Sequence, residues 1–412
     1  MDVVYQRCCG LDVHQKTVVA CVVVSEGRGK KRKEVRTFST VTKELEGLSG
    51  WLEERNVTHV AMEATGVYWK PVWNVLDGQF ELLLANVRHI KAVPGRKTDV
   101  KDCEWIADLL QHGLLRGSFV PPQEIQDLRE LTRYRTQVTQ ERTAVTNRIQ
   151  KVLEGANIKL ASVASDVLGA SGRKMLEALI DGQKDAEQLA DMAQRRMRSK
   201  IPELRLALQG NVREHHQILL RSLMEHWKFL EGQIASLDEK IETSMVPFEG
   251  PANLWQTVPG ISKLTAWNLV AEIGVNMDQF PSAQHLASWA GLCPGNNESA
   301  GKRLSGRARH GNLWLKRIAC QAAWAASHSK RTYCSAQYRR LAGRRGKKRA
   351  IIAVAHTLLV AGYSMLKNSC PYQDLGENYF DRINRQNRQR YHVNRLRQLG
   401  FIVKLEAVEH AA

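Results

Sequence analysis

The sequence lacks the features that mark several classes of protein. No two of its eight cysteines form a CxxC pair, and none lies at zinc-like spacing from a histidine, so we expect reduced thiols in a cytoplasmic protein. No apolar run approaches the ~18 residues that span a membrane, and the N-terminus has no signal-peptide pattern. With 43% hydrophobic and 25% charged residues, the chain is neither collagen, nor mostly disordered, nor a disulfide miniprotein. Its 412 residues predict more than one domain.

Acidic residues are missing from one long stretch. Residues 299–349 hold 15 Lys and Arg and no Asp or Glu, within a chain of formal net charge +18, whereas residues 1–120 are nearly neutral. The alternative is a disordered basic tail. Four aromatic residues are interleaved with the charges, namely Trp314, Trp324, Tyr333 and Tyr338. Apolar residues also recur near helical spacing, which favours a folded basic surface that binds nucleic-acid phosphates.

The first 120 residues alternate between strand and helix patterns. We predict strands at 3–11, 17–25, 34–40, 58–64 and 81–85, helices at 43–55, 68–76 and 99–112, and a basic turn at 27–33. This order is typical of a mixed α/β sheet that begins with an antiparallel hairpin. It predicts an RNase H-like layout for residues 1–120.

The remainder has helical patterns. Pro121–Pro122 breaks the chain, and residues 121–250 contain long amphipathic stretches at 123–155 and about 203–245. These form either a coiled-coil arm used for dimerisation or an ordinary helical bundle. We expect a mostly helical domain at 251–370 and a basic tail at 371–412.

Four carboxylates have a pattern that suits catalysis. Asp12 and Glu63 end apolar strands, while Asp99 and Asp102, three residues apart, share one face of a helix start. Clustered carboxylates repel one another unless a cation neutralises them, and their oxygens suit Mg²⁺ or Mn²⁺. Two such ions clamp a phosphodiester during an in-line displacement. Taken singly, each acid also fits a structural role as a helix cap or turn residue.

A serine lies within a basic, Gly-rich segment of the C-terminal half. Ser299 is followed by cationic candidates for nucleic-acid binding, namely Lys302, Arg303, Arg307, Arg309 and Lys316. A serine that attacks a phosphate needs such positive charge, and Ser305 is the competing candidate. Upstream, residues 254–274 read as two helices around Pro259–Gly260, either a phosphate-binding helix-hairpin-helix or a plain αα turn.

Together these motifs resemble a known family. The chain is similar to the DEDD transposases of the insertion-sequence-110 family, including its 1111 branch and the pilin-gene invertases. The matching motifs are G-L-D-V-H at 10–14, M-E-A-T-G at 62–66, K-T-D-V-K-D at 97–102, V-P-G-I at 258–261, A-G-L-C-P at 290–294, Ser299, H-G-N at 310–312 and A-I-I-A-V-A-H at 350–356.

The resemblance implies residue roles and partners. It implies a RuvC-like domain that binds Mg²⁺ through Asp12, Glu63, Asp99 and Asp102, and a second domain whose Ser299 links covalently to DNA. It further implies recombination of donor and target DNA of an insertion sequence, directed by a structured RNA that the element encodes. Dimers or tetramers would combine the acids of one subunit with the serine of another, with no membrane involved.

The nucleophile motif departs from the family pattern. The family commonly has Ser-Gly, whereas this chain has Ser299-Ala300-Gly301, and Ser305-Gly306 restores the dipeptide. The spacing from Pro294 favours Ser299.

Two other functions compete with recombination. One is a RuvC-like, metal-dependent, structure-selective nuclease such as a junction resolvase, and the other is a non-catalytic nucleic-acid binder. Recombination is favoured because a resolvase needs neither the arm nor the second domain.

Overall fold

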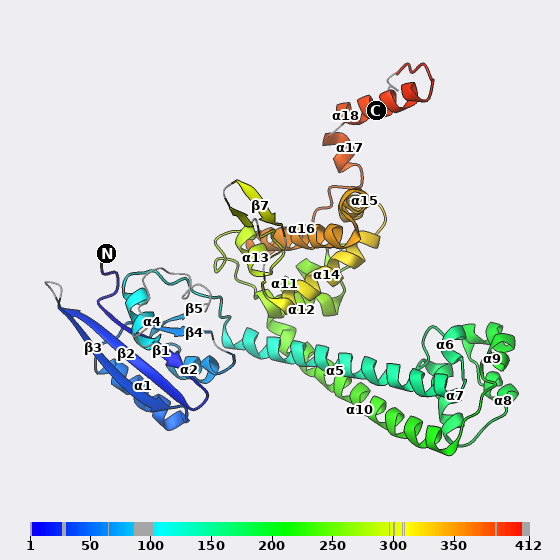
Figure 1. Ribbon diagram of the computed structural model, residues 1–412, viewed down its shortest axis with the longest axis horizontal. Helices are drawn as coiled ribbons and strands as arrows, with labels where there is room; N and C mark the ends of the chain where they lie inside the picture. Colours follow the sequence, from blue (N-terminus) through cyan, green and yellow to red (C-terminus); the bar gives the residue numbers. More distant parts are fainter. Residues whose placement is uncertain are drawn as a thin grey trace. The chain divides into compact units, whose positions relative to one another are not determined.

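The chain divides into two compact units. The computed structural model describes residues 2–26, 30–64, 66–85, 102–295, 297–299, 301–306, 308, 310–383 and 385–405. The first unit is Met1–Val120 and the second is Pro121–Ala412 (Figure 1). The boundary falls at two consecutive prolines, of which Pro122 is the N-cap of the next helix. Proline suits a helix start because it has no backbone N–H, and an N–H at this position would have no hydrogen-bond partner within the helix.

The described part of the first unit contains a five-stranded mixed sheet with helices between its strands. Its elements are β1 (Arg7–Val13), β2 (Thr17–Glu26), β3 (Lys30–Ser39), α1 (Thr42–Glu53), β4 (His59–Glu63), α2 (Trp69–Leu76), β5 (Glu81–Ala85) and α4 (Asp102–Gln111). The strand order is β3-β2-β1-β4-β5, antiparallel among the first three and parallel between β1, β4 and β5. Within the described residues the strands and helices follow one another in the predicted order, and the opening hairpin is antiparallel as predicted.

Some predicted boundaries are wrong. β1 begins at Arg7 rather than at residue 3, since residues 3–6 lie largely exposed outside the sheet. The basic residues from Lys30 to Lys33 belong to β3 rather than to a turn, because they pair with β2. Lys31, Arg32 and Lys33 are exposed at the sheet edge, and such charges are a common way of protecting an edge strand.

Alternation along β1 assigns its residues to two faces. Cys9, Leu11 and Val13 pack with α1 and α2, whereas Cys8 packs with α4 on the opposite face. Gly10 faces α4 so closely that a Cβ would lie 2.3 Å from the Cys103 carbonyl oxygen and 2.4 Å from the Ala107 nitrogen. The missing side chain therefore lets α4 lie directly on the central strand.

All eight cysteines are free, as predicted. Cys8, Cys21 and Cys103 are buried between the sheet and α4, whereas Cys9 is buried on the opposite face of the sheet. Burial raises the pKa of the Cys8 thiol to about 12, so this thiol stays neutral at physiological pH. These side chains act as small apolar groups.

Two long helices dominate the beginning of the second unit. Helix α5 (Gln123–Gly155) and helix α10 (Glu214–Met245) lie side by side (Figure 1). They are antiparallel, because Arg135 contacts Asp238 whereas Arg142, farther along α5, contacts Trp227, earlier in α10. Short helices at their far end complete a shared apolar core, namely α6 (Leu160–Val163), α7 (Ala170–Ile180), α8 (Ala186–Asp191) and α9 (Ile201–Ala207), with the 3₁₀ helix η1 (Arg195–Lys200). The pair lies within one chain, and its use in dimerisation stays a prediction.

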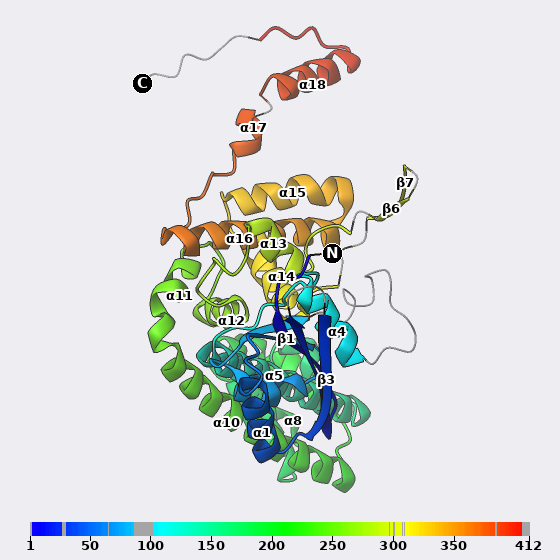
Figure 2. The ribbon, with the colours of Figure 1, turned by 90° about the vertical axis from the view of Figure 1, so that its left-hand side faces the viewer.

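The rest of the second unit is mostly helical. Its helices are α11 (Glu249–Gln256), α12 (Lys263–Ile273), α13 (Ala283–Trp289), α14 (Leu313–His328), α15 (Tyr333–Arg345), α16 (Lys347–Asn368), α17 (Tyr379–Ile383) and α18 (Arg385–Gln398), and the 3₁₀ helix η2 (Val246–Phe248) precedes them. The basic, Gly-rich segment that contains Ser299 includes a small hairpin of β6 (Asn297–Ser299) and β7 (Lys302–Ser305). The hairpin projects beyond α13 and α16 (Figure 2). Leu313, the first residue of α14, is 69% exposed, whereas Leu315 and Ala319 of the same helix are buried.

Among the described residues, helix α16 is long and apolar enough on average to cross a membrane, although it contains no continuous apolar run of that length. Half of its most apolar window is nevertheless buried within the protein. It packs so closely on α11 that a Cβ at Gly362 would lie 1.9 Å from the Trp255 ring. These contacts are those of a central core helix.

Candidate active site

Two of the predicted acids lie side by side at one end of the sheet. In the parallel pair β1–β4, Leu11 is the partner of Met62, so Asp12 and Glu63 follow at neighbouring positions. The alternation that directs Leu11 and Met62 toward α1 and α2 directs Asp12 and Glu63 toward the α4 face. The Asp12 side chain is 25% exposed, and its Oδ2 accepts a hydrogen bond from His14 Nε2 at 3.2 Å.

Helix α4 brings a third acid to the same face. Asp102 is its first residue, next to Cys103, whose carbonyl faces Gly10 two positions before Asp12. Asp99 lies outside the described residues. Within the described ranges, no group of three or more His, Cys, Asp or Glu side chains is close enough to hold a metal ion.

The donor set nevertheless fits a hard divalent cation. Asp12, Glu63 and Asp102 offer only carboxylate oxygens, which Mg²⁺ and Mn²⁺ prefer over nitrogen or sulfur. They come from two adjacent strand ends and a helix start on one face. Asp12 and Glu63, at neighbouring strand positions, repel each other unless a cation neutralises them.

The predicted nucleophile lies at a hairpin tip. Ser299 is the last residue of β6 and pairs with Lys302, the first residue of β7. Gly301, in the connection, has φ +73°, a conformation that favours glycine. Ser305, the competing serine, ends β7 and pairs with Asn297 at the other end of the hairpin.

The predicted nucleic-acid-binding residues extend from the hairpin to the next helix. Lys302 is exposed at the start of β7, where Arg303 follows it, and Lys316 is half-buried in the first turn of α14. Arg307 and Arg309 lie outside the described residues. The described candidates therefore share one segment with Ser299.

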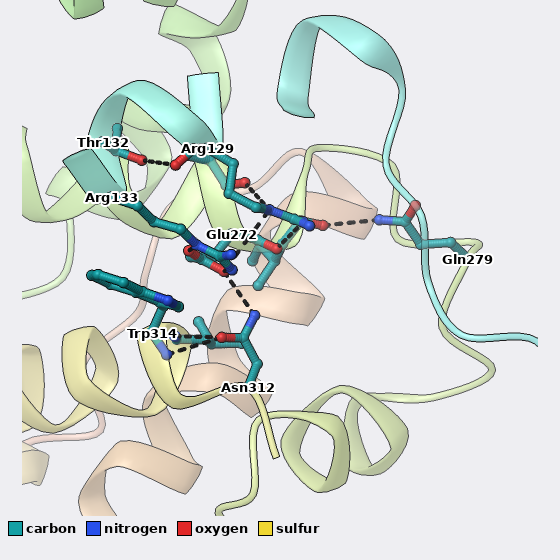
Figure 3. Close-up of polar contacts among 10 residues, drawn as sticks. Arg129, Thr132, Arg133, Glu272, Gln279, Asn312 and Trp314 are labelled. Carbon is teal, nitrogen blue, oxygen red and sulfur yellow. Dashed lines mark hydrogen bonds and ion pairs between the residues drawn. The ribbon is translucent and has the colours of Figure 1, made fainter. Parts of the chain in front are cut away.

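A buried charge cluster connects the long helix α5 to this segment (Figure 3). Glu272 of α12 is 1% exposed and accepts hydrogen bonds from Arg133 Nε at 2.7 Å and Nη2 at 2.8 Å. Its Oε2 also accepts from Asn312 Nδ2 at 2.7 Å, while Asn312 Oδ1 accepts from the backbone N–H groups of Trp314 and Leu315 in the first turn of α14. Asn312, part of the H-G-N motif, thus caps the helix after the hairpin and ties it to α5.

A second arginine completes the cluster. Arg129 donates to the backbone carbonyls of Ala271 at 3.1 Å and Glu272 at 2.7 Å, close to the C-terminus of α12. The helix dipole favours a cation at this end. Burial lowers the pKa of Arg129 to about 10, which leaves it charged at physiological pH. The cluster therefore holds two cations against one carboxylate and a helix end.

Removing the Glu272 carboxylate is expected to destabilise the second unit strongly. Glu272→Ala leaves Arg129 and Arg133 partly buried without their counter-charge, so we expect a loss of about 3–5 kcal/mol. The measurement is urea unfolding of the full chain followed by circular dichroism. Asp238→Ala is the matched control, because Asp238 binds Arg135 but is 40% exposed, so its loss should cost at most about 1 kcal/mol. Equal losses in both variants would contradict the role given to the cluster.

Sequence reasoning missed Glu272, Arg129 and Arg133. A signal was present, since Glu272 is the only acid in the apolar run from Leu269 to Ile273. Its two arginine partners lie 139 and 143 residues away along the chain, which no local pattern indicates.

Comparison with known proteins gives these residues a family context. A family model for the DEDD transposases of IS110 matches residues 9–158, and a model described as "Transposase IS116/IS110/IS902 family" matches residues 252–339. The two matches include all four predicted acids and Ser299. The chain belongs to the IS110 family of transposases.

Named relatives agree with this assignment. A probable family 20 transposase of Pseudomonas aeruginosa is 26% identical over 303 residues, covering 72% of this chain and 79% of the relative. An insertion element IS110 protein of Streptomyces coelicolor is 32% identical over 37% of this chain and 36% of its own length. A pilin gene-inverting protein of Moraxella bovis is 31% identical over 29% of this chain and 38% of its own length.

The family match confirms the predicted class of enzyme. This transposase is a DNA-acting recombination enzyme, and DEDD transposases are typically metal-dependent. Its mixed sheet is compatible with an RNase H-like start.

Proposed function

We propose that the transposase is a site-specific recombinase that cuts and rejoins DNA with a Mg²⁺-binding acidic site and a serine nucleophile. The observation that carries this proposal is the adjacency of Asp12 and Glu63 on the α4 face, with Asp102 at the start of that helix. Asp99 is proposed as the fourth acid. Mg²⁺, or Mn²⁺ in its place, would neutralise charge on the phosphate undergoing substitution.

Ser299 is proposed to form the covalent intermediate. Its Oγ would attack a DNA phosphorus, forming an O–P bond while the phosphorus–oxygen bond to the adjacent sugar breaks. The departing sugar oxygen takes up a proton and becomes a hydroxyl. Attack by a hydroxyl from another DNA end then restores the phosphodiester and frees Ser299. Lys302, its cross-strand neighbour, supports this role because positive charge stabilises the crowded phosphate.

The basic segment supports separate roles for protein and RNA in DNA recognition, with the protein binding the phosphates and the RNA selecting the sequence. No acid interrupts residues 299–349, so this surface suits contacts with phosphates of any sequence. We propose that sequence choice is delegated to a structured guide RNA encoded by the element, which pairs with donor and target DNA. We further propose action in the cytoplasm as a dimer or tetramer in which the acids of one subunit work with Ser299 of another.

A covalent-adduct assay tests the proposed function. The transposase is purified from cells that carry its native flanking DNA, so that any cognate RNA accompanies it. It is then incubated with Mg²⁺ and labelled element-junction DNA and analysed on a denaturing gel. We expect a protein–DNA adduct that requires Mg²⁺. Cleaved DNA without an adduct would instead establish the alternative, a metal-dependent structure-selective nuclease.

Phosphate contacts predict a steep dependence of DNA affinity on salt. Each contact contributes about −0.9 to the slope of log affinity against log salt concentration. Lys316→Gln is expected to make the slope shallower by about one contact. The measurement is fluorescence anisotropy across a salt series. Lys228→Gln is the control, since Lys228 is already paired with Glu177 at 2.7 Å and its loss should leave the slope unchanged. A wild-type affinity that does not vary with salt would overturn this assignment.

A further inference from the structure

A cavity of about 960 Å³ lies at the base of the hairpin that carries Ser299. Pro294 and Ala308, which form a β-bridge below the hairpin, line one side of it. Helices α15 and α16 supply the other side. The α16 residues that line it lie beyond residue 339, where the second family match ends.

The mouth of this cavity is cationic. Arg345 at the end of α15 and Lys348 and Arg349 at the start of α16 line it, and all three are exposed. No acid is present among the described residues that line the cavity. Such a cluster suits a phosphate group, because arginine offers a fork of donors that matches its oxygens.

The interior carries an unsatisfied hydrogen-bond acceptor. Gln337 lines the cavity, and its Oε1 is buried without a hydrogen-bond partner among the described residues. The Thr357 hydroxyl donates to the Ala353 carbonyl at 3.1 Å, so it accepts from Gln337 Nε2 at 2.9 Å. This network directs the amide nitrogen toward Thr357 and leaves the oxygen in need of an N–H donor. A buried acceptor without a partner costs about 1–3 kcal/mol, which a ligand N–H would recover.

The remaining wall suits a flat ring. Ile352 provides an apolar surface, and His356 is half-buried one helical turn away. Burial lowers the pKa of His356, which favours the neutral imidazole and therefore stacking rather than phosphate binding. A ligand that fits all these features has an anionic end, a planar apolar body and an N–H group.

We propose that this cavity binds one unstacked nucleotide, with its phosphate at Arg345, Lys348 and Arg349 and its base beside Gln337 and His356. A base within a duplex is stacked and cannot enter such a cavity, so the nucleotide must be rotated out or single-stranded. This inference rests on the proposed function in one respect. The nucleotide is taken to belong to the DNA or guide RNA strand that the protein binds near Ser299.

The hairpin length places this nucleotide near the reacting phosphate. Ser299 lies five positions after Pro294, a span of at most ~17 Å for an extended chain. At about 3.4 Å per nucleotide along one DNA strand, the bound nucleotide lies within about five positions of the attacked phosphate. The cavity would therefore fix the register of the strand relative to Ser299.

Base-flipping fluorescence tests the proposal directly. 2-Aminopurine, which fluoresces strongly when unstacked, is placed at each position near the junction in the DNA, and in a second series in the guide RNA. Binding of the Ser299→Ala variant is expected to raise fluorescence several-fold at one position, and the responding series identifies the source of the strand. Ile352→Trp, which fills the cavity, should abolish the rise. Arg344→Ala should preserve it, since Arg344 is an exposed α15 cation outside the cavity.

A second variant keeps the proposal testable if Ile352→Trp does not fold. Gln337→Leu removes the acceptor at similar volume and should reduce the rise if Ile352→Trp does not fold. A wild-type complex with no responsive position, or a rise that survives both cavity variants, would overturn the proposal. The fluorescence assay needs only binding, whereas the adduct is assayed on the wild-type protein. A rise in Ser299→Ala together with no adduct in the wild type would refute the serine chemistry alone, and a wild-type adduct without any rise would refute the nucleotide cavity alone.

Discussion

Ser299→Ala is expected to eliminate the covalent protein–DNA adduct and to reduce recombination by about 10⁴-fold or more, since no other group replaces a missing nucleophile. Ser299 lies at the tip of β6–β7, so loss of one hydroxyl should leave the fold unchanged. DNA affinity is expected to stay within about tenfold of wild type, because the phosphate contacts come from the basic residues. Adduct formation on a denaturing gel and a junction-exchange assay measure the two effects.

Ser305→Ala is the matched control for this experiment. Ser305 belongs to the same hairpin and is followed by glycine, but it lies at the opposite end, paired with Asn297. The control should form the adduct at the wild-type level. An adduct that persists in Ser299→Ala and disappears in Ser305→Ala would move the nucleophile to Ser305.

Asp12→Asn is expected to reduce strand cleavage by about 10³-fold or more. Asparagine keeps the shape of aspartate but removes the charge that holds and orients a divalent cation, and the electrostatic stabilisation of the reacting phosphate is lost with it. The cation requirement should also change, because a weakened site needs more Mg²⁺ to fill. The measurement is cleavage rate as a function of Mg²⁺ concentration, with DNA affinity measured alongside.

Asp108→Asn provides the control for Asp12→Asn. Asp108 also belongs to the first unit, on α4, but it pairs with Lys31 at 3.5 Å on the exposed surface. Its substitution should leave cleavage and its Mg²⁺ dependence unchanged. Wild-type cleavage by Asp12→Asn would show that the acids at the sheet end are structural. That result would not bear on the role of Ser299, which the adduct assay tests separately.

Local patterns were sufficient to predict most of the regular structure. The helix predicted at 123–155 is α5 with the same bounds, because a stripe that includes Leu128, Val138 and Val145 repeats at helical spacing. The strand predicted at 81–85 is β5. Strand boundaries were less certain, as at β1, where the Val-rich residues before Arg7 resemble a strand but have no partner in the sheet.

The β6–β7 hairpin was missed for a different reason. Strands of three and four residues are too short to establish an alternating pattern, and the Gly, Asn and Ser residues around them read as a loop. Pairing between them, rather than either sequence alone, defines the strands. The position of Ser299 at a turn was therefore not predictable from its neighbours.

The sequence by itself indicated the element order, the candidate acids and serine, and the acid-free basic segment at 299–349, because alternation, amphipathic spacing and charge are local properties. Only the tertiary structure decided which distant residues meet. Strand pairing placed Asp12 beside Glu63, and helix packing brought Glu272 to Arg133 and left Gln337 Oε1 buried in a cationic cavity. The physical reason is that these contacts depend on register and packing between segments far apart in the chain, which no window of neighbouring residues specifies.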